Sequence, residues 1–119
     1  MVYFHGGCFT SGSPEYYNMA NLVEDALDDG AQAGVIGVSV SFRVGVLGHM
    51  ASTSLKQRNL RTANAGEAGS AGNWGIQDQR QSLRWVRDNI ASFGGDPNNV
   101  LIFGHSSGGG SVAAHMVMP

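Results

Sequence analysis

Three short apolar runs, each rich in β-branched or aromatic residues, constrain this chain more than any other feature of its sequence. They are Val2 to Phe4, Val35 to Phe42 and Val100 to Phe103, and each is closed by a turn signal. Such runs are typical of strands that are buried on both faces. Because helical patterns separate them, the sequence predicts an α/β fold, with a mostly parallel sheet and flanking helices.

Helical patterns lie between the runs and after the last of them. Apolar residues recur at helical spacing from Tyr16 to Leu27, and Ser13 is a suitable N-cap. A second helix is predicted from Ile76 to Phe93, where Gly94 begins a turn, and a third helix follows Ser106. The stretch from Gly48 to Gly75 lacks periodicity, so we expect a long surface loop there.

Composition and charge limit the classes of partner. The chain is 42% hydrophobic and 13% charged with a net charge of -2, as expected of a globular core. Nothing calls for nucleic acid, because the one basic cluster lies in a polar stretch without aromatic residues: Lys56, Arg58 and Arg61. No apolar run is long enough for a transmembrane segment. The single cysteine and the absence of a signal-like stretch leave localisation open.

The strongest chemical signal is Gly104-His105-Ser106-Ser107-Gly108, which follows the third strand and opens the third helix. A serine hydroxyl is a poor nucleophile unless a base accepts its proton, and a tight turn from strand to helix holds the side chain where base and substrate reach it. The pattern predicts Ser106 as a catalytic nucleophile. A glycine turn with an incidental serine is the alternative.

A second signal is His5-Gly6-Gly7-Cys8, at the end of the first strand. In acyl transfer, negative charge develops on the carbonyl oxygen, and backbone N–H groups stabilise it only where no side chain blocks their approach. We therefore predict an oxyanion hole made by the N–H groups of Gly7, Cys8 and Ser107. The alternative is a glycine turn beside a buried thiol.

These motifs, with longer patterns around them, resemble the type-B carboxylesterase/lipase family, which includes the cholinesterases. The family's H-G-G-G-F resembles residues 5–9, its N-Y-R-x-G-x-x-G resembles residues 41–48, and its G-N-x-G-x-x-D-Q resembles residues 72–79. Its L-R-W-V-x-x-N-I-x-x-F-G-G-D-P-x-x-V matches residues 83–100 almost throughout. Cys8 replaces the family's third glycine, and His105-Ser106-Ser107 stands where Glu-Ser-Ala is more frequent. These departures bear on substrate preference more than on activity.

The resemblance implies an α/β-hydrolase fold, and the length implies a partial domain. An α/β enzyme domain usually needs roughly 200–250 residues, so we expect residues 1–119 to be a fragment truncated at both ends. In this fold the triad follows the order Ser, acid, His. After Ser106 the chain has no Asp or Glu, and His115 lies too far along the same helix to act as base. The acid and the base are therefore expected beyond Pro119.

The remaining histidines are expected to have structural roles. His5 is predicted to shape the oxyanion loop, His105 to brace the turn, and His49 to lie in a loop. Arg43 and Asp78 are predicted to form a buried ion pair beneath the active site, because each lies in an otherwise apolar or glycine-rich segment.

The sequence therefore predicts a carboxylic ester hydrolase that forms an acyl-enzyme on Ser106 and acts on a small-molecule or lipid ester. No metal or organic cofactor is implied, and the chain alone is expected to be inactive because it lacks the triad acid and histidine. One alternative is a catalytically inactive adhesion or binding module related to the cholinesterases. A truncated product with no function of its own is another.

Overall fold

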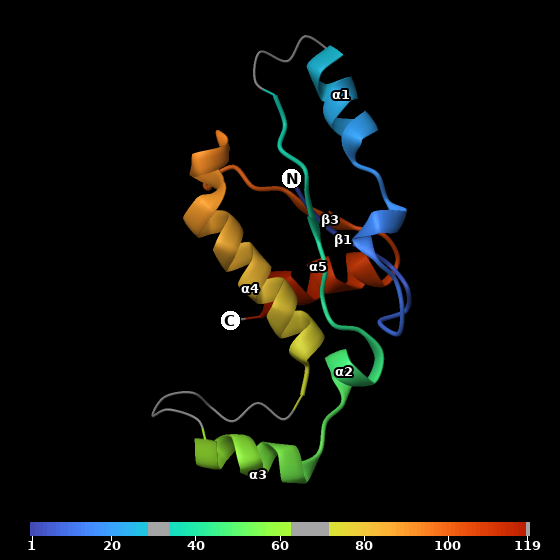
Figure 1. Ribbon diagram of the computed structural model, residues 1–119, viewed down its shortest axis with the longest axis vertical. Helices are drawn as coiled ribbons and strands as arrows, with labels where there is room; N and C mark the ends of the chain where they lie inside the picture. The colour runs from blue at the N-terminus through green and yellow to red at the C-terminus, as the bar shows by residue number, and fades with distance from the viewer. Residues whose placement is uncertain (29–33, 63–71, 119) are drawn as a thin grey trace.

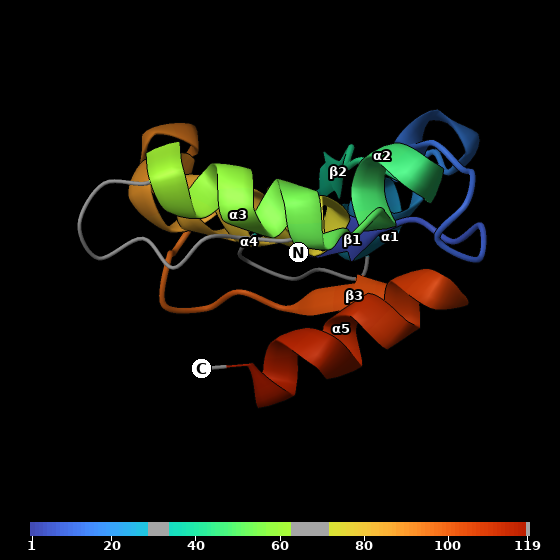
Figure 2. The same cartoon turned by 90° about the horizontal axis from the view of Figure 1, so that it is seen from below.

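A computed structural model describes residues 1–28, 34–62 and 72–118. Its sheet contains three parallel strands in the order β2-β1-β3: β1 (Val2–Phe4), β2 (Val38–Val40) and β3 (Ile102–Gly104). Figure 2 shows this order, with α5 (Ser107–Val117) running beside β3. The predicted α/β architecture and its parallel strands are confirmed, although only the middle of the second apolar run forms ladder bonds.

One face of the sheet carries the hydrophobic core. Val2 and Phe4 of β1 lie level with Val38 and Val40 of β2, so their side chains share a face. Two helices cover that face: α4 (Trp74–Asn89) through Val86, and α5, whose partly buried Val112 packs against the same cluster. The core cluster of buried residues comprises Val2, Phe4, Val40, Phe42, Val86 and Ile90.

The other face of the sheet meets the segment that follows β1. Tyr3 and Phe103 project from this face with ring centroids 5.1 Å apart, and Tyr17 packs against Tyr3 at 5.3 Å. Ser39 of β2 donates a hydrogen bond to the sulfur of Met19 at 3.1 Å. The chain from β1 to α1 (Ala20–Asp28) therefore covers the face opposite to α4 and α5.

The predicted helix from Tyr16 is wrong at its start. Ser13 does act as an N-cap, accepting from the N–H of Glu15 at 3.3 Å, but it caps only a short 3-10 helix, η1 (Pro14–Tyr16). The chain then leaves helical geometry at Tyr17, and α1 begins at Ala20, whose N–H is accepted by the side chain of Asn18 at 2.9 Å.

The second predicted helix is confirmed with small shifts at its ends. It begins two residues early at Trp74, and its last turn tightens into a 3-10 helix, η2 (Ile90–Phe93). Gly94 ends it in the left-handed region, with φ of 85°, as is common for the residue after a helix.

The predicted loop from Gly48 to Gly75 is wrong in part. Residues 45–49 form α2 (Gly45–His49), so His49 ends a helix, and residues 53–62 form α3 (Thr53–Thr62), which carries Lys56, Arg58 and Arg61. Ser52 caps α3, because its side chain accepts from the N–H of Leu55 at 3.2 Å. Residues 50–52 and 72–73 lie outside helices and strands, as predicted, and residues 63–71 of the predicted loop lie outside the described residues.

The described chain is elongated. It measures 55 × 30 × 22 Å with α1 and α3 at opposite ends, as Figure 1 shows, and its radius of gyration is 16.5 Å. A compact domain of this length has a radius of gyration of about 13–14 Å. In the part of the chain that the structure describes, no helix is long and apolar enough to cross a membrane.

The predicted ion pair between Arg43 and Asp78 is confirmed, but it is not buried. Two guanidinium N–H groups and the backbone N–H of Arg43 donate to the carboxylate of Asp78 at 2.7, 2.7 and 3.0 Å. The side chains are 49% and 27% exposed, although the guanidinium carbon of Arg43 lies 5.9 Å from the centroid of the Trp74 ring. These hydrogen bonds hold the pKa of Asp78 below its ordinary value.

We expect Asp78→Ala to have a small effect on stability. Water and salt screen an exposed pair, so the substitution should lower the Tm of the full-length protein by less than about 4 °C at pH 7. Since the folded-state pKa is depressed, this contribution is present above the ordinary aspartate value of about 3.9 and fades as the pH falls below it. Thermal unfolding at pH 7 and at a pH below about 3.9 checks this. Asp88→Ala is the matched control, because Asp88 pairs at 2.7 Å with its neighbour Arg87 and both are more exposed.

Candidate active site

The two predicted site motifs lie at the same edge of the sheet. Phe4 of β1 is level with Gly104 of β3, and the strands are parallel, so the segments that leave their carboxyl ends start side by side. The first is the loop of residues 5–12, called here the glycine loop. The second is the turn of residues 104–108 that joins β3 to α5, called here the serine turn.

Ser106 occupies a strained backbone position at the tip of the serine turn. Its φ of 55° and ψ of -121° fall where residues other than glycine rarely occur, and such a conformation costs about 1–3 kcal/mol. Strain of this kind persists only when the surrounding structure imposes it. The residue is exposed.

The tight turn depends on glycine at position 108. A Cβ at Gly108 would lie 2.0 Å from the carbonyl oxygen of Phe4, and a Cβ at Gly104 would lie 2.4 Å from the backbone carbon of Gly108. These approaches bring the first turn of α5 directly against β1 and β3. The spacing of the two glycines therefore reflects close backbone packing around Ser106.

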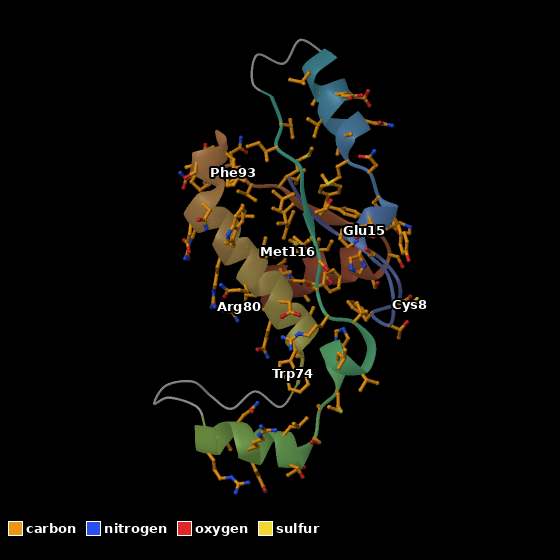
Figure 3. The ribbon with its side chains drawn as sticks, in the orientation of Figure 1. Cys8, Glu15, Trp74, Arg80, Phe93 and Met116 are labelled. Atoms are coloured by element: carbon orange, nitrogen blue, oxygen red, sulfur yellow. The ribbon has the colours of Figure 1, made fainter. Side chains whose placement is uncertain are left out.

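The glycine loop lies directly against Ser106. A Cβ at Gly6 would be 2.9 Å from the carbonyl oxygen of His105 and 3.2 Å from the Cβ of Ser106. Two residues of the loop, Cys8 and Phe9, have φ of 52° and 60°, in the left-handed region that favours glycine. Figure 3 shows Cys8 on this loop at the edge of the molecule, and its side chain is exposed.

The carbonyl of Gly6 fixes the direction of the N–H of Gly7, because both groups belong to the same peptide. His5 is 1% exposed, and its Nδ1 lies 2.8 Å from the oxygen of Gly6. Because a carbonyl only accepts, Nδ1 is the donor in this hydrogen bond. The peptide is trans, so the N–H of Gly7 points the opposite way, out of the loop.

The same reasoning applies to the N–H groups of Cys8 and Ser107. The oxygen of Gly7 accepts from the N–H groups of Thr10 and Ser11 at 3.0 and 3.1 Å, which turns the N–H of Cys8 outward. The oxygen of Ser106 accepts from Gly110 at 3.2 Å, which turns the N–H of Ser107 out of the end of α5. In the described segments, none of the three predicted donors gives its hydrogen to a backbone oxygen.

A hydrogen bond also joins the glycine loop to the serine turn. The N–H of Phe9 donates to the hydroxyl of Ser107 at 3.4 Å. The sequence motif predicted a role only for the N–H of Ser107, and no pattern in the sequence pointed to this hydroxyl. The side chain of Ser107 therefore bridges the two halves of the site.

The four histidines all make contacts away from the hydroxyl of Ser106. His5 stacks on Phe42 with centroids 4.2 Å apart, and His49 packs edge-on against Phe9. The Nδ1 of His105 lies 3.4 Å from the hydroxyl of Tyr17.

His115 bonds through its Nε2 to Gln79 at 3.0 Å. Burial, with the charge of Arg80, lowers the pKa of His115. Across residues 1–28, 34–62 and 72–118, no hydrogen bond joins a histidine to Ser106, and no group of three or more metal-binding side chains is placed to hold an ion.

Comparison with known proteins gives consistent matches. The profile of the carboxylesterase family matches residues 1–119. Esterase-5A of Drosophila persimilis is 38% identical over 113 residues, 95% of this chain and 17% of that protein. Human bile salt-activated lipase is 37% identical over 120 residues, all of this chain and 14% of the lipase.

Solved structures show the same relationship. The crystal structure of Aspergillus niger EstA superposes with a TM-score of 0.71 at 38% identity, over 96% of this chain and 19% of that one. A PNB esterase superposes with a TM-score of 0.70 at 36% identity, over 99% of this chain and 22% of that one. The predicted α/β-hydrolase fold is confirmed. The chain spans less than a quarter of the length of each of these proteins.

Proposed function

This chain belongs to the carboxylesterase family, and from that premise we propose that the full-length protein hydrolyses carboxylic esters through an acyl-enzyme on Ser106. The observation that carries the proposal is the strained, exposed Ser106 at the turn from β3 to α5, packed against the glycine loop. A strained serine at this place in a parallel sheet is the arrangement that presents a nucleophile to both a base and a substrate.

The proposed reaction has two acyl-transfer steps. The hydroxyl oxygen of Ser106 attacks the ester carbonyl carbon while its proton passes to a histidine base, which then protonates the departing alcohol. Water, activated by the same base, attacks the acyl-enzyme and releases the acid. In both steps the carbonyl oxygen becomes negative, and the outward N–H groups of Gly7, Cys8 and Ser107 are the proposed donors to it. We propose that the base and its carboxylate partner come from sequence after Pro119, in the order Ser, acid, His.

The proposed substrate is a small-molecule or lipid carboxylic ester. The names of the relatives, an esterase and a bile salt-activated lipase, cover both kinds. Hydrolysis of aryl esters of short and long fatty acids by the full-length protein tests the proposal. We expect steady turnover, preceded by a burst of alcohol where release of the acyl group is the slow step. A folded protein that hydrolyses neither series would contradict it and would favour an inactive binding module.

We expect the isolated chain of 119 residues to hydrolyse these esters far more slowly than the full-length protein. Without a base, Ser106 keeps its proton, and oxyanion donors alone leave roughly 10³–10⁴-fold acceleration over water in enzymes of this mechanism. The assay compares both proteins at equal concentration. Enzyme-like turnover by the isolated chain that disappears in its Ser106→Ala variant would show that a residue within the chain acts as base, with His5 the first to be tested.

Cys8 is expected to affect which acyl groups fit. Its side chain stands where the family more often has glycine, next to the proposed donors. Cys8→Gly should therefore raise kcat/KM for esters of bulky acyl groups relative to acetate esters. The space gained is that of one or two methylene groups, so the expected gain is about tenfold. The backbone N–H is kept, so the acetate ester should still be hydrolysed. Cys8→Ser is the matched control, because it keeps nearly the same volume. Equal preferences in all three proteins would show that the side chain lies outside the acyl site.

A further inference from the structure

A chain of buried polar side chains joins α4 to the first turn of α5. The side-chain amide of Gln79 donates to the hydroxyl of Ser111 at 3.0 Å, and that hydroxyl donates to the carbonyl oxygen of Ser107 at 3.2 Å. On its other side, the amide oxygen of Gln79 lies 3.0 Å from the Nε2 of His115. Gln79 and Ser111 are both fully buried.

The direction of these hydrogen bonds follows from chemistry. The carbonyl of Ser107 only accepts, so the hydroxyl of Ser111 must donate to it and can accept only from the NH₂ group of Gln79. The oxygen of Gln79 then faces His115, whose Nε2 carries the proton. The lowered pKa of His115 agrees with a neutral ring in this tautomer. The amide nitrogen and oxygen of Gln79, the hydroxyl of Ser111 and the Nε2 of His115 therefore each have a partner.

Packing alone does not explain polar groups at this place. Apolar side chains of similar shape between two helices would be as stable or more so, whereas a half-satisfied polar network is costly. The network does, however, end on the residue that follows the proposed nucleophile. Ser107 is held by Ser111 at its carbonyl and by Phe9 at its hydroxyl.

The strained conformation of Ser106 needs contacts of this kind to hold it. Unusual φ and ψ values relax unless neighbouring contacts hold them, and here the peptide between Ser106 and Ser107 carries both the strained residue and a proposed oxyanion donor. A rotation of the first turn of α5 would move the hydroxyl of Ser106 and the N–H of Ser107 together.

We propose that Gln79 is a positioning residue, which through Ser111 fixes the first turn of α5 and so holds Ser106 and the N–H of Ser107 in register with the glycine loop. This inference rests on the proposed ester hydrolysis at Ser106. Gln79 acts on the rate of the chemical step and makes no contact with substrate.

The test compares variants of the full-length protein in steady-state ester hydrolysis. Gln79→Met keeps the length of the side chain and removes its hydrogen bonds, and Ser111→Ala removes the link to Ser107. Each should lower kcat by about 10- to 100-fold with KM nearly unchanged, since small misplacements of reacting groups are costly. Because the two residues act in series, the double variant should be no slower than the worse single variant. Ser82→Ala is the matched control, because Ser82 donates to the backbone of Gln79 from the same helix at 2.7 Å without joining the chain.

Thermal unfolding of each variant separates positioning from loss of structure. A kcat of at least half the wild-type value in folded Gln79→Met or Ser111→Ala would overturn the inference, as would an equal loss in Ser82→Ala. If Gln79→Met does not fold, Ser111→Ala decides alone. Failure of the proposed function looks different: the wild-type protein would then be inactive, or Ser106→Ala would keep the wild-type rate.

Discussion

Ser106→Ala should lower kcat for ester hydrolysis by the full-length protein by about 10⁵-fold or more. The substitution removes the attacking oxygen, and loss of the nucleophile in enzymes of this mechanism costs about as much as loss of the whole triad. The fold should survive, because Ser106 is exposed and no other residue in the described segments depends on its hydroxyl. Steady-state kinetics with an activated ester and a thermal unfolding curve measure both effects.

Ser107→Ala is the control for that experiment. Alanine keeps the backbone N–H that is the proposed donor, and it removes only a hydroxyl that accepts one long hydrogen bond of 3.4 Å from Phe9 and donates none in the described segments. We expect a loss of kcat smaller than about tenfold. A loss as large as that of Ser106→Ala would show that the roles of the two serines are misassigned.

Gly108→Ala should prevent the full-length protein from folding into an active enzyme. The new methyl group would lie 2.0 Å from the carbonyl oxygen of Phe4, and its three nearest atoms all belong to the backbone of Phe4 and His5, so no flexible side chain can yield. Overpacking costs about 1–3 kcal/mol where side chains can adjust, and more is expected here. Soluble yield, thermal unfolding and hydrolysis of an activated ester measure the damage.

Gly110→Ala is the matched control on the same helix. Its Cβ would meet only the ring of Phe9, at 3.6 Å, which is an ordinary contact. Alanine also favours a helix over glycine by about 1 kcal/mol, so this variant should be as stable as the wild type or slightly more so. A Gly108→Ala protein as stable and active as Gly110→Ala would show that α5 does not pack closely against β1.

The sequence was sufficient to predict the structure where a local pattern determines the local backbone geometry. The three apolar runs predicted the strands, and glycines on both sides of Ser106 predicted a tight turn that the close packing of Gly108 explains. The motif of residues 5–8 and the motif of residues 104–108 lie side by side because the parallel strands β1 and β3 carry both to the same edge of the sheet.

The sequence was not sufficient where contacts between distant segments decide the outcome. The pairing of Arg43 with Asp78 was predictable from charge, but their exposure depends on what surrounds them in space. The buried chain from Gln79 depends on how α4 and α5 pack together, because Gln79 and Ser111 are 32 residues apart, and no sequence spacing encodes that packing. Helix α3 was missed because its apolar residues are sparse, although Ser52 before a run of good helix formers was a usable signal.

The most direct test of the central claim is to treat the full-length protein with a fluorophosphonate ester and locate the adduct by peptide mass spectrometry. Such reagents react with a serine that is activated by a base beside oxyanion donors. We predict one adduct per molecule, on Ser106, with hydrolysis lost in proportion to labelling and no adduct in Ser106→Ala. An adduct on another residue, or ester hydrolysis that continues after Ser106 is fully labelled, would contradict the assignment of Ser106 as the nucleophile.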